Sequence, residues 1–209
     1  MLYLLNQLES FWGPFRLFEY ISVRAILAGF TALALGMLLS GPIIRKLGQL
    51  RQPERSKALM GDLAKEGGKV PTMGGLLIGA AMVPSVLLWA KPNVLVLASL
   101  FCLLGMGLVG FVDDWLKVRH GSSDGISART KLAGQAVVAL LALGIVLLDP
   151  AYRSSLCEIW LPILNGPVWS DHTFGWPFGV CLAVAVAFVA LVCMGCSNAV
   201  NLTDGLDGL

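Results

Sequence analysis

Charged side chains are scarce in this sequence. Only 13% of its 209 residues are Asp, Glu, Lys or Arg, whereas 56% are hydrophobic. A soluble domain carries about 25% charged residues, and the mean hydropathy here is +0.77. The composition therefore excludes a soluble globular domain and indicates an integral membrane protein. We expect a lipid bilayer around it and no nucleic-acid partner.

The N-terminus lacks the features of a cleavable secretory signal. Its first twenty residues have neither a basic start nor a small-residue cleavage site. They predict an interfacial or short helical segment, and aromatic residues would anchor it at the membrane surface. These aromatic residues are Phe11, Trp12, Phe15, Phe18 and Tyr20.

Histidine and cysteine do not form a recognisable metal motif. The only two histidines, His120 and His172, are expected on opposite sides of the membrane. Cys193 and Cys196 have the spacing of a redox or metal pair, but no second pair or nearby histidine completes such a site. We interpret the cysteines as small hydrophobic packing residues.

Five apolar stretches are long enough to predict transmembrane helices. They cover residues 21–44, 72–90, 94–112, 132–148 and 178–197. Residues 149–177 are expected to lie along the outer surface as short helices or a hairpin. No span has a charged residue near its middle, which argues against an ion transporter. The predicted fold class is all-α, a polytopic membrane helix bundle forming one domain over residues 1–209.

The distribution of Lys and Arg residues predicts which side of the membrane each loop of the bundle occupies. The loop between the first two spans holds seven Lys or Arg residues, and the loop after residue 112 holds four more, out of fifteen in the chain. The positive-inside rule places these loops in the cytoplasm. Two acidic clusters, at the ends of spans 94–112 and 178–197, would then also face the cytoplasm.

The first acidic cluster is Asp113 and Asp114, followed by Lys117. Adjacent residues on a helix point about 100° apart, so the two carboxylates cannot do the same work. Lys117 is within reach of either one. Such a group can bind Mg²⁺ through carboxylates while the lysine meets a phosphate. Taken alone, the motif is better explained as an ordinary polar helix end with a weak surface ion pair.

The second cluster repeats a polar residue at every third position. Glycines at 205 and 208 interrupt it, which predicts that the helix loosens into a loop and turns polar groups toward a ligand. A polar cap and turn is the alternative, but it accounts for one Asn and one Gly only. The repeated residues are Asn198, Asn201, Asp204 and Asp207.

Two predicted helix entrances are candidate anion sites. Lys65 and Lys69 precede Pro-Thr-Met-Gly-Gly at residues 71–75, and a helix N-terminus with nearby lysines suits an anion. Ordinary helix-start chemistry and close packing are the alternative. The basic segment 125–131 leads into the fourth span, where a positive-inside anchor is the alternative.

Three motifs together resemble the polyprenyl-phosphate sugar-1-phosphate transferase family. They are Pro-Thr-Met-Gly-Gly at 71–75, Gly-Phe-Val-Asp-Asp-x-x-Lys at 110–117 and Asn-Ala-Val-Asn-Leu-Thr-Asp-Gly-Leu-Asp-Gly-Leu at 198–209. Residues 71–75 and Lys117 favour its phospho-N-acetylmuramoyl-pentapeptide transferase branch. The resemblance implies Mg²⁺-dependent transfer of phospho-MurNAc-pentapeptide from UDP-MurNAc-pentapeptide to undecaprenyl phosphate. The products would be lipid I and UMP, made at the cytoplasmic face of the bacterial inner membrane by a possible homodimer.

The resemblance also implies roles for individual residues. Asp113 would activate or position the lipid phosphate, Asp114 would organise the site and Lys117 would meet a phosphate. Asp114, Asn201 and Asp204 are the implied Mg²⁺ ligands. The implied substrate and nucleotide contacts are Lys65 or Lys69, Thr72, Lys131, Asn198, Asn201, Asp204 and Asp207.

The resemblance covers about half of the family's length. Members have roughly ten membrane helices and a further metal-binding aspartate beyond the part matched here. We therefore expect the chain to be a fragment, without a complete active site of its own. The alternatives are a membrane fragment that binds UDP-sugar or polyprenyl phosphate without catalysis, and a sibling transferase that uses UDP-GlcNAc.

Overall fold

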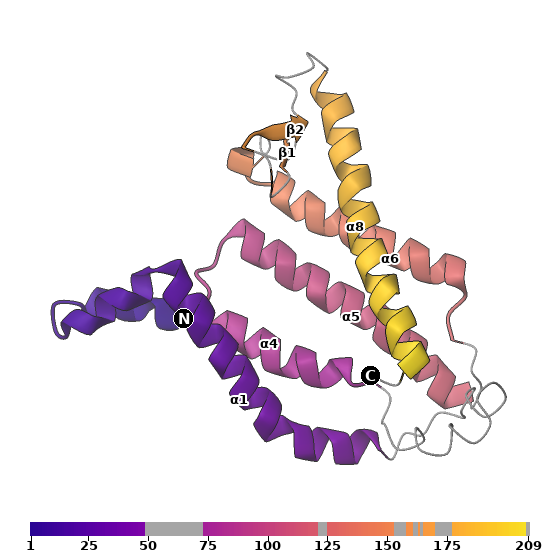
Figure 1. Cartoon of the computed structure of the whole chain (residues 1–209), viewed down its shortest axis with the longest axis horizontal. Coiled ribbons are helices and arrows are strands. Elements are labelled where there is room, and N and C mark those ends of the chain that lie inside the picture. Colours follow the sequence, from indigo (N-terminus) through magenta and orange to yellow (C-terminus); the bar gives the residue numbers. More distant parts are fainter. Residues whose placement is uncertain are drawn as a thin grey trace. The chain divides into compact units, whose positions relative to one another are not determined.

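The predicted all-α class is confirmed. The computed structural model describes residues 1–48, 73–120, 125–152, 158–160, 163, 165–169 and 177–207, and Figure 1 shows that helices dominate them. The main helices are α1 (Ile21–Leu47), α4 (Gly75–Trp89), α5 (Val94–His120), α6 (Ala128–Leu147) and α8 (Phe178–Asp207).

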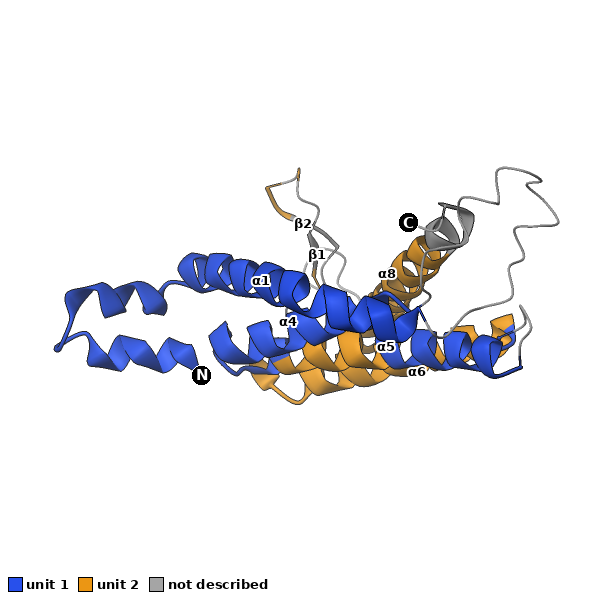
Figure 2. Ribbon diagram, turned by 90° about the horizontal axis from the view of Figure 1, so that it is seen from below, with its two compact units in different colours: residues 1–96, 107–127 blue, residues 97–106, 128–209 orange. Residues whose placement is uncertain are grey.

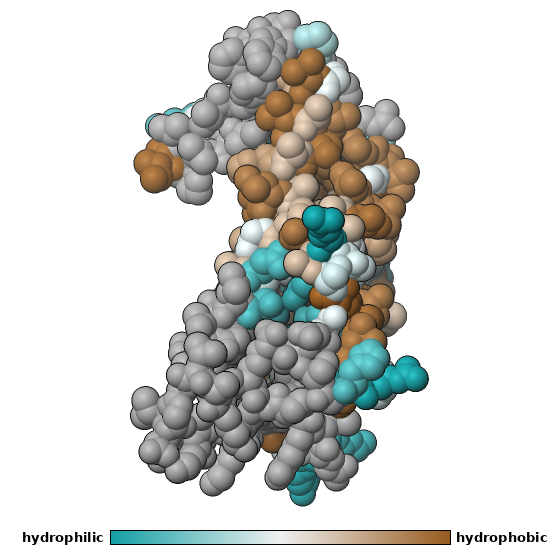
Figure 3. All heavy atoms as spheres, turned by 90° about the vertical axis from the view of Figure 1, so that its right-hand side faces the viewer, coloured by the Kyte–Doolittle hydropathy of each residue, from teal (hydrophilic) through white to brown (hydrophobic). Residues whose placement is uncertain are grey.

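Four of the described helices are long and apolar enough to cross a membrane. These are α1, α5, α6 and residues Gly179–Asn201 of α8. Large apolar side chains stay exposed along them, and Figure 3 shows apolar side chains over much of the described surface on one face. Such surface is expected against lipid rather than water. The chain is therefore a multi-pass membrane protein.

The second predicted span is shorter than expected. We predicted a helix over residues 72–90, whereas α4 has 15 residues. A helix of that length measures about 22 Å, less than the about 30 Å of a bilayer's hydrocarbon core. The described residues thus contain four full-length spans and one shorter apolar helix.

The chain divides into two compact units, coloured separately in Figure 2. Unit 1 comprises residues 1–96 and 107–127, and unit 2 comprises residues 97–106 and 128–209. Helix α5 contributes to both. Each unit has its own polar contacts, which are described separately below.

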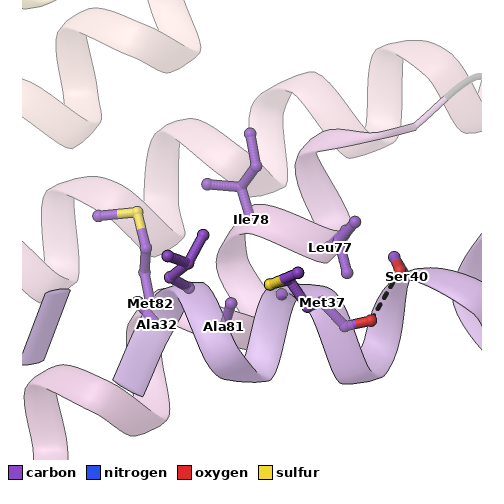
Figure 4. Close-up of a pocket in the computed structure, with 9 residues that line it drawn as sticks. Ala32, Met37, Ser40, Leu77, Ile78, Ala81 and Met82 are labelled. Atoms are coloured by element: carbon purple, nitrogen blue, oxygen red, sulfur yellow. Dashed lines mark hydrogen bonds between the residues drawn. The ribbon is translucent and has the colours of Figure 1, made fainter. Parts of the chain in front are cut away.

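In unit 1, α1 and α4 lie side by side. Trp89 Nε1 donates a hydrogen bond of 2.9 Å to Thr31 Oγ1, and a Cβ added to Gly36 would be 4.0 Å from the Ala81 Cβ. Small residues of this kind let membrane helices approach closely. An apolar groove of about 390 Å³ runs between the two helices (Figure 4). Its lining is Ala32, Leu33, Gly36, Met37, Ser40, Leu77, Ile78, Ala81 and Met82.

The N-terminus forms two short 3₁₀ helices, as predicted. They are η1 (Leu2–Leu8) and η2 (Gly13–Glu19). The ammonium group of Met1 donates to the backbone oxygens of Leu87 and Leu88, at 3.0 and 2.7 Å. A positive charge at the C-terminal end of α4 is favourable because the last carbonyls of a helix carry partial negative charge.

In unit 2, Gly105 of α5 lies close to Val138 of α6, and α6 packs against α8. The segment after α6 contains the short helix η4 (Pro150–Tyr152) and an antiparallel pair of strands, β1 (Ile159–Trp160) and β2 (Pro167–Trp169). Short helices or a hairpin were predicted for residues 149–177, and the described part of this segment contains a short helix and an antiparallel strand pair.

Substitution of Gly105 by Ala should destabilise unit 2. An added Cβ would be 2.6 Å from Val138 Cγ1, which forces either side chain or helix to move. Overpacking of this kind costs about 1–3 kcal/mol. Thermal unfolding in detergent should show a lower midpoint for Gly105→Ala and recovery in Gly105→Ala/Val138→Ala. Gly107→Ala is the control because its Cβ would meet nothing within 4 Å; equal midpoints for the two glycine variants would contradict the close approach.

Candidate functional site

Helix α5 continues beyond its predicted end. The predicted span stopped at residue 112, but the helix runs to His120, so Asp113 and Asp114 lie in the last turns of the helix rather than just beyond it. Two kinds of contact between neighbouring turns support the extra length. Lys117 pairs with both carboxylates, and the rings of Phe111 and Trp115 stack with their centroids 6.0 Å apart.

Lys117 bridges the two carboxylates. Its Nζ lies 2.7 Å from Asp113 Oδ2 and 3.2 Å from Asp114 Oδ1. The sequence predicted that the lysine can reach either residue, and the structure shows that it reaches both. Two carboxylates and one ammonium leave the cluster with one formal negative charge. Charge-assisted contacts of this kind hold side chains in a defined geometry.

Asp113 also joins α5 to the segment before α6. Its side chain is 6% exposed, and Oδ1 accepts a 2.8 Å hydrogen bond from the Ile126 backbone N–H. Gly125 lies against the same oxygen, since a Cβ at residue 125 would overlap Asp113 Oδ1 and lie 2.8 Å from Lys117 Cε. Asp113 is therefore a buried acceptor with both oxygens engaged.

Asp114 and Lys117 form the solvent-accessible part of the cluster. The side chains of Asp114 and Lys117 are 33% and 22% exposed. Carboxylate oxygen is a ligand that Mg²⁺ prefers, and an ammonium group suits a phosphate. The described residues contain no group of three His, Cys, Asp or Glu side chains that would form a complete metal site. Asp114 is thus of the right donor class but needs further ligands.

The predicted loop after span 178–197 is wrong. Helix α8 continues without a break through Asp207, including Gly205. One glycine in a helix costs only about 1 kcal/mol relative to alanine, which does not suffice to end this one. On a continuous helix, residues three apart advance by about 60° around the axis. The four polar positions therefore spread over a broad sector around the axis of α8.

Several predicted site residues are only partly placed. The backbone of Asp204 and Asp207 is helical, but their side chains lie outside the described structure. Asn201 is exposed on α8, and Lys131 is half-buried in the first turn of α6. Lys65, Lys69 and Thr72 lie outside the described residues.

Asn198 engages protein groups within unit 2. Its Nδ2 donates to Gln135 Oε1 at 2.7 Å and to Met194 O at 2.8 Å. Gln135 is 1% exposed, and the sequence reasoning did not single it out. The available signal was a lone glutamine inside an otherwise apolar span, because intramembrane polar residues are expensive and require partners.

Residue 73 is a second feature that sequence reasoning missed. Met73, in the 71–75 motif, is 7% exposed and has a φ of 68°. This left-handed conformation is unfavourable for a bulky side chain. The Leu76 N–H donates to Met73 O at 3.0 Å, so the strained residue lies directly at the beginning of α4.

The fold and the cluster define a class: a multi-pass helical membrane protein with a lysine-bridged pair of aspartates at the end of a spanning helix. Residues 96–209 match glycosyl transferase family 4. The match covers more than half of the sequence, and the chain belongs to this family.

Individual curated proteins that resemble this chain carry more specific names than the family model. The chain is 37% identical over 214 residues to the phospho-N-acetylmuramoyl-pentapeptide-transferase of Opitutus terrae, covering 100% of this chain and 55% of that protein. It is 43% identical over 216 residues to the protein of that name in Methylacidiphilum infernorum (100% and 56%). The Maridesulfovibrio salexigens protein of that name is 38% identical over 200 residues (94% and 52%). The chain thus spans about half the length of these curated relatives.

Proposed function

We propose that residues 1–209 belong to a phospho-N-acetylmuramoyl-pentapeptide transferase. The observation that carries the proposal is the lysine-bridged Asp113–Asp114 pair at the end of α5. Similarity along the whole chain to proteins of this name supports it. The substrates would be UDP-MurNAc-pentapeptide and undecaprenyl phosphate, and the products lipid I and UMP. The basic loops favour a site on the cytoplasmic side of the bacterial inner membrane.

The proposed reaction exchanges one pyrophosphate bond for another. A phosphate monoester has a second pKa near 6, so the lipid phosphate is largely dianionic at pH 7 and is already a nucleophile. Its oxygen forms a bond to the sugar-linked phosphorus of the donor. The bond from that phosphorus to the bridging oxygen breaks, and UMP leaves with this oxygen. The main task for the protein is then to hold two anions together and to stabilise the developing charge.

In this proposal, Lys117 contacts a phosphate and Asp113 holds Lys117 in place. Lys117 is partly exposed, whereas Asp113 is buried and both of its oxygens accept hydrogen bonds. A carboxylate that attacks phosphorus needs an oxygen free to face the substrate. The burial of Asp113 therefore favours direct attack by the lipid phosphate over a phospho-aspartyl intermediate at this residue.

Asp114 is the proposed Mg²⁺ ligand of the described cluster, with Asn201 and Asp204 as further ligand candidates. Bound Mg²⁺ would neutralise phosphate charge during transfer. Asp114 presents a carboxylate that is one-third exposed and engaged by Lys117 through Oδ1. This arrangement leaves part of the Asp114 carboxylate accessible for a metal ion.

Donor competition tests the proposal. The complete gene product that contains residues 1–209 is incubated with undecaprenyl phosphate and equal concentrations of UDP-MurNAc-pentapeptide and UDP-GlcNAc. We expect lipid-linked MurNAc-pentapeptide as the main product. Lipid-linked GlcNAc as the main product would replace the proposal with the sibling transferase. Saturable binding of either donor without any lipid product would indicate a binding module instead.

A further inference from the structure

A buried polar cluster joins α6 to α8, and Gln135 is its central member. Its side chain amide makes two contacts across the helix pair. Nε2 donates to Ser197 Oγ at 3.1 Å, and Oε1 accepts from Asn198 Nδ2 at 2.7 Å. Gln135 is 1% exposed, and an amide without partners is strongly unfavourable in an apolar interior. The three side chains therefore constrain one another.

Both amide hydrogens of the Asn198 side chain are engaged within unit 2. An asparagine amide has two hydrogens. In Asn198, one is directed to Gln135 Oε1 and the other to Met194 O, four residues back on α8. The resemblance implies that this residue contacts the substrate or its nucleotide. In the structure its amide nitrogen serves the helix pair, which leaves its carbonyl oxygen as the part that can accept a bond from a ligand.

The α8 members of the cluster lie on the same helix as the polar repeat, which consists of Asn198, Asn201, Asp204 and Asp207, so a rotation of the helix at the cluster also moves the repeat. Asn201 follows Asn198 by about 4.5 Å along the helix axis, and residue 204 follows by about 9 Å. At a radius of about 5–6 Å from the axis, rotation of α8 by about 20° would shift these helix positions by about 2 Å. A displacement of 1 Å at a reacting centre can cost about 100-fold in rate.

We propose that Gln135 is a positioning residue that sets the rotation of α8 against α6 through Asn198. It thereby places the polar repeat that begins at Asn198. The role of Gln135 in catalysis rests on the proposed function; the hydrogen-bonded link between α6 and α8 does not. Gln135 does not touch substrate in this account and acts only through α8.

An exchange of the two amides tests the coupling. Gln135→Asn shortens one side chain by a methylene, and Asn198→Gln lengthens its partner by one, so the double variant preserves the reach between the helices. In the complete gene product, each single variant should lower kcat about tenfold or more, with the KM of either substrate changed less than about threefold. The double variant should recover kcat to within about threefold of the unmodified protein. Gln7→Asn, an exposed residue of η1, is the matched control.

Thermal unfolding of the same variants in detergent provides a readout that does not need activity. We expect both single variants to melt earlier and the double variant to recover. Recovery of the midpoint without recovery of kcat would overturn the positioning role, because Asn198 would then act on the substrate itself. No recovery in either measurement would overturn the coupling between Gln135 and Asn198. If the unmodified protein is inactive, the proposed function fails, and the melting experiment alone decides whether Gln135 and Asn198 are coupled.

Discussion

Replacement of Asp113 by Asn should reduce turnover of the complete gene product by about 100-fold or more, a loss comparable to removing one preorganised electrostatic group. The reason is visible in the two acceptor contacts of Asp113. Oδ2 accepts from Lys117 Nζ and Oδ1 accepts from the Ile126 N–H. An asparagine has only one acceptor oxygen, so one of these two donors would face an NH₂ group. The loss therefore frees either Lys117, which Asp114 alone would then hold, or the Ile126 N–H in front of α6.

Asp149→Asn is the matched control for this substitution. Asp149 Oδ1 accepts a single 3.0 Å hydrogen bond from the Ala151 N–H, which an asparagine oxygen can also accept. This variant should keep near-normal turnover. Steady-state rates and the amount of folded protein in membranes are measured for both variants. Near-normal turnover of Asp113→Asn at equal protein levels would remove Asp113 from the site.

Replacement of Gly125 by Ala should be almost as damaging. The new Cβ would overlap Asp113 Oδ1 and lie 2.8 Å from Lys117 Cε. Since Asp113 is buried and held by Lys117 and Ile126, the carboxylate has little room to retreat. We expect a loss of turnover of about tenfold to 100-fold together with a stability loss of about 1–3 kcal/mol.

Gly110→Ala separates a local effect at Asp113 from a general effect of adding a methyl group. Gly110 lies one turn before Asp113 on α5, and a Cβ there would meet nothing within 4 Å. Turnover and thermal midpoint should therefore stay close to those of the unmodified protein. If Gly125→Ala has the same turnover and thermal midpoint as Gly110→Ala, then the close approach of Gly125 to Asp113 does not affect activity or stability.

The sequence predicted the helices well because hydrophobic length is a strong signal in membrane proteins. It placed the first, third and fifth spans within α1, α5 and α8, and the fourth span, 132–148, overlaps all but the first turn of α6. It predicted their ends less well. Helix α5 extends to His120 because contacts between turns support a polar end. Likewise, α8 passes through Gly205, where local glycine preference predicted a loop.

The candidate site was only partly predictable for a related reason. Spacing alone showed that Lys117 could reach Asp113 or Asp114. It could not show that the Ile126 N–H and Gly125 close over Asp113, because these contacts depend on how the segment before α6 returns to α5. The pairing of Gln135 with Asn198 is also a contact between distant segments, and a single sequence does not reveal such contacts.

The identity of the released nucleotide tests the central claim most directly. Glycosyl transfer from a UDP-sugar breaks the bond between sugar and phosphate and releases UDP, whereas transfer of a phospho-sugar breaks the pyrophosphate and releases UMP. The complete gene product is incubated with UDP-MurNAc-pentapeptide, undecaprenyl phosphate and Mg²⁺, and the nucleotides are separated and quantified against the lipid product. We predict UMP in equal amount to lipid-linked product, and both formed about 100-fold or more slowly by Asp113→Asn. Release of UDP in that amount would contradict phospho-sugar transfer by this protein.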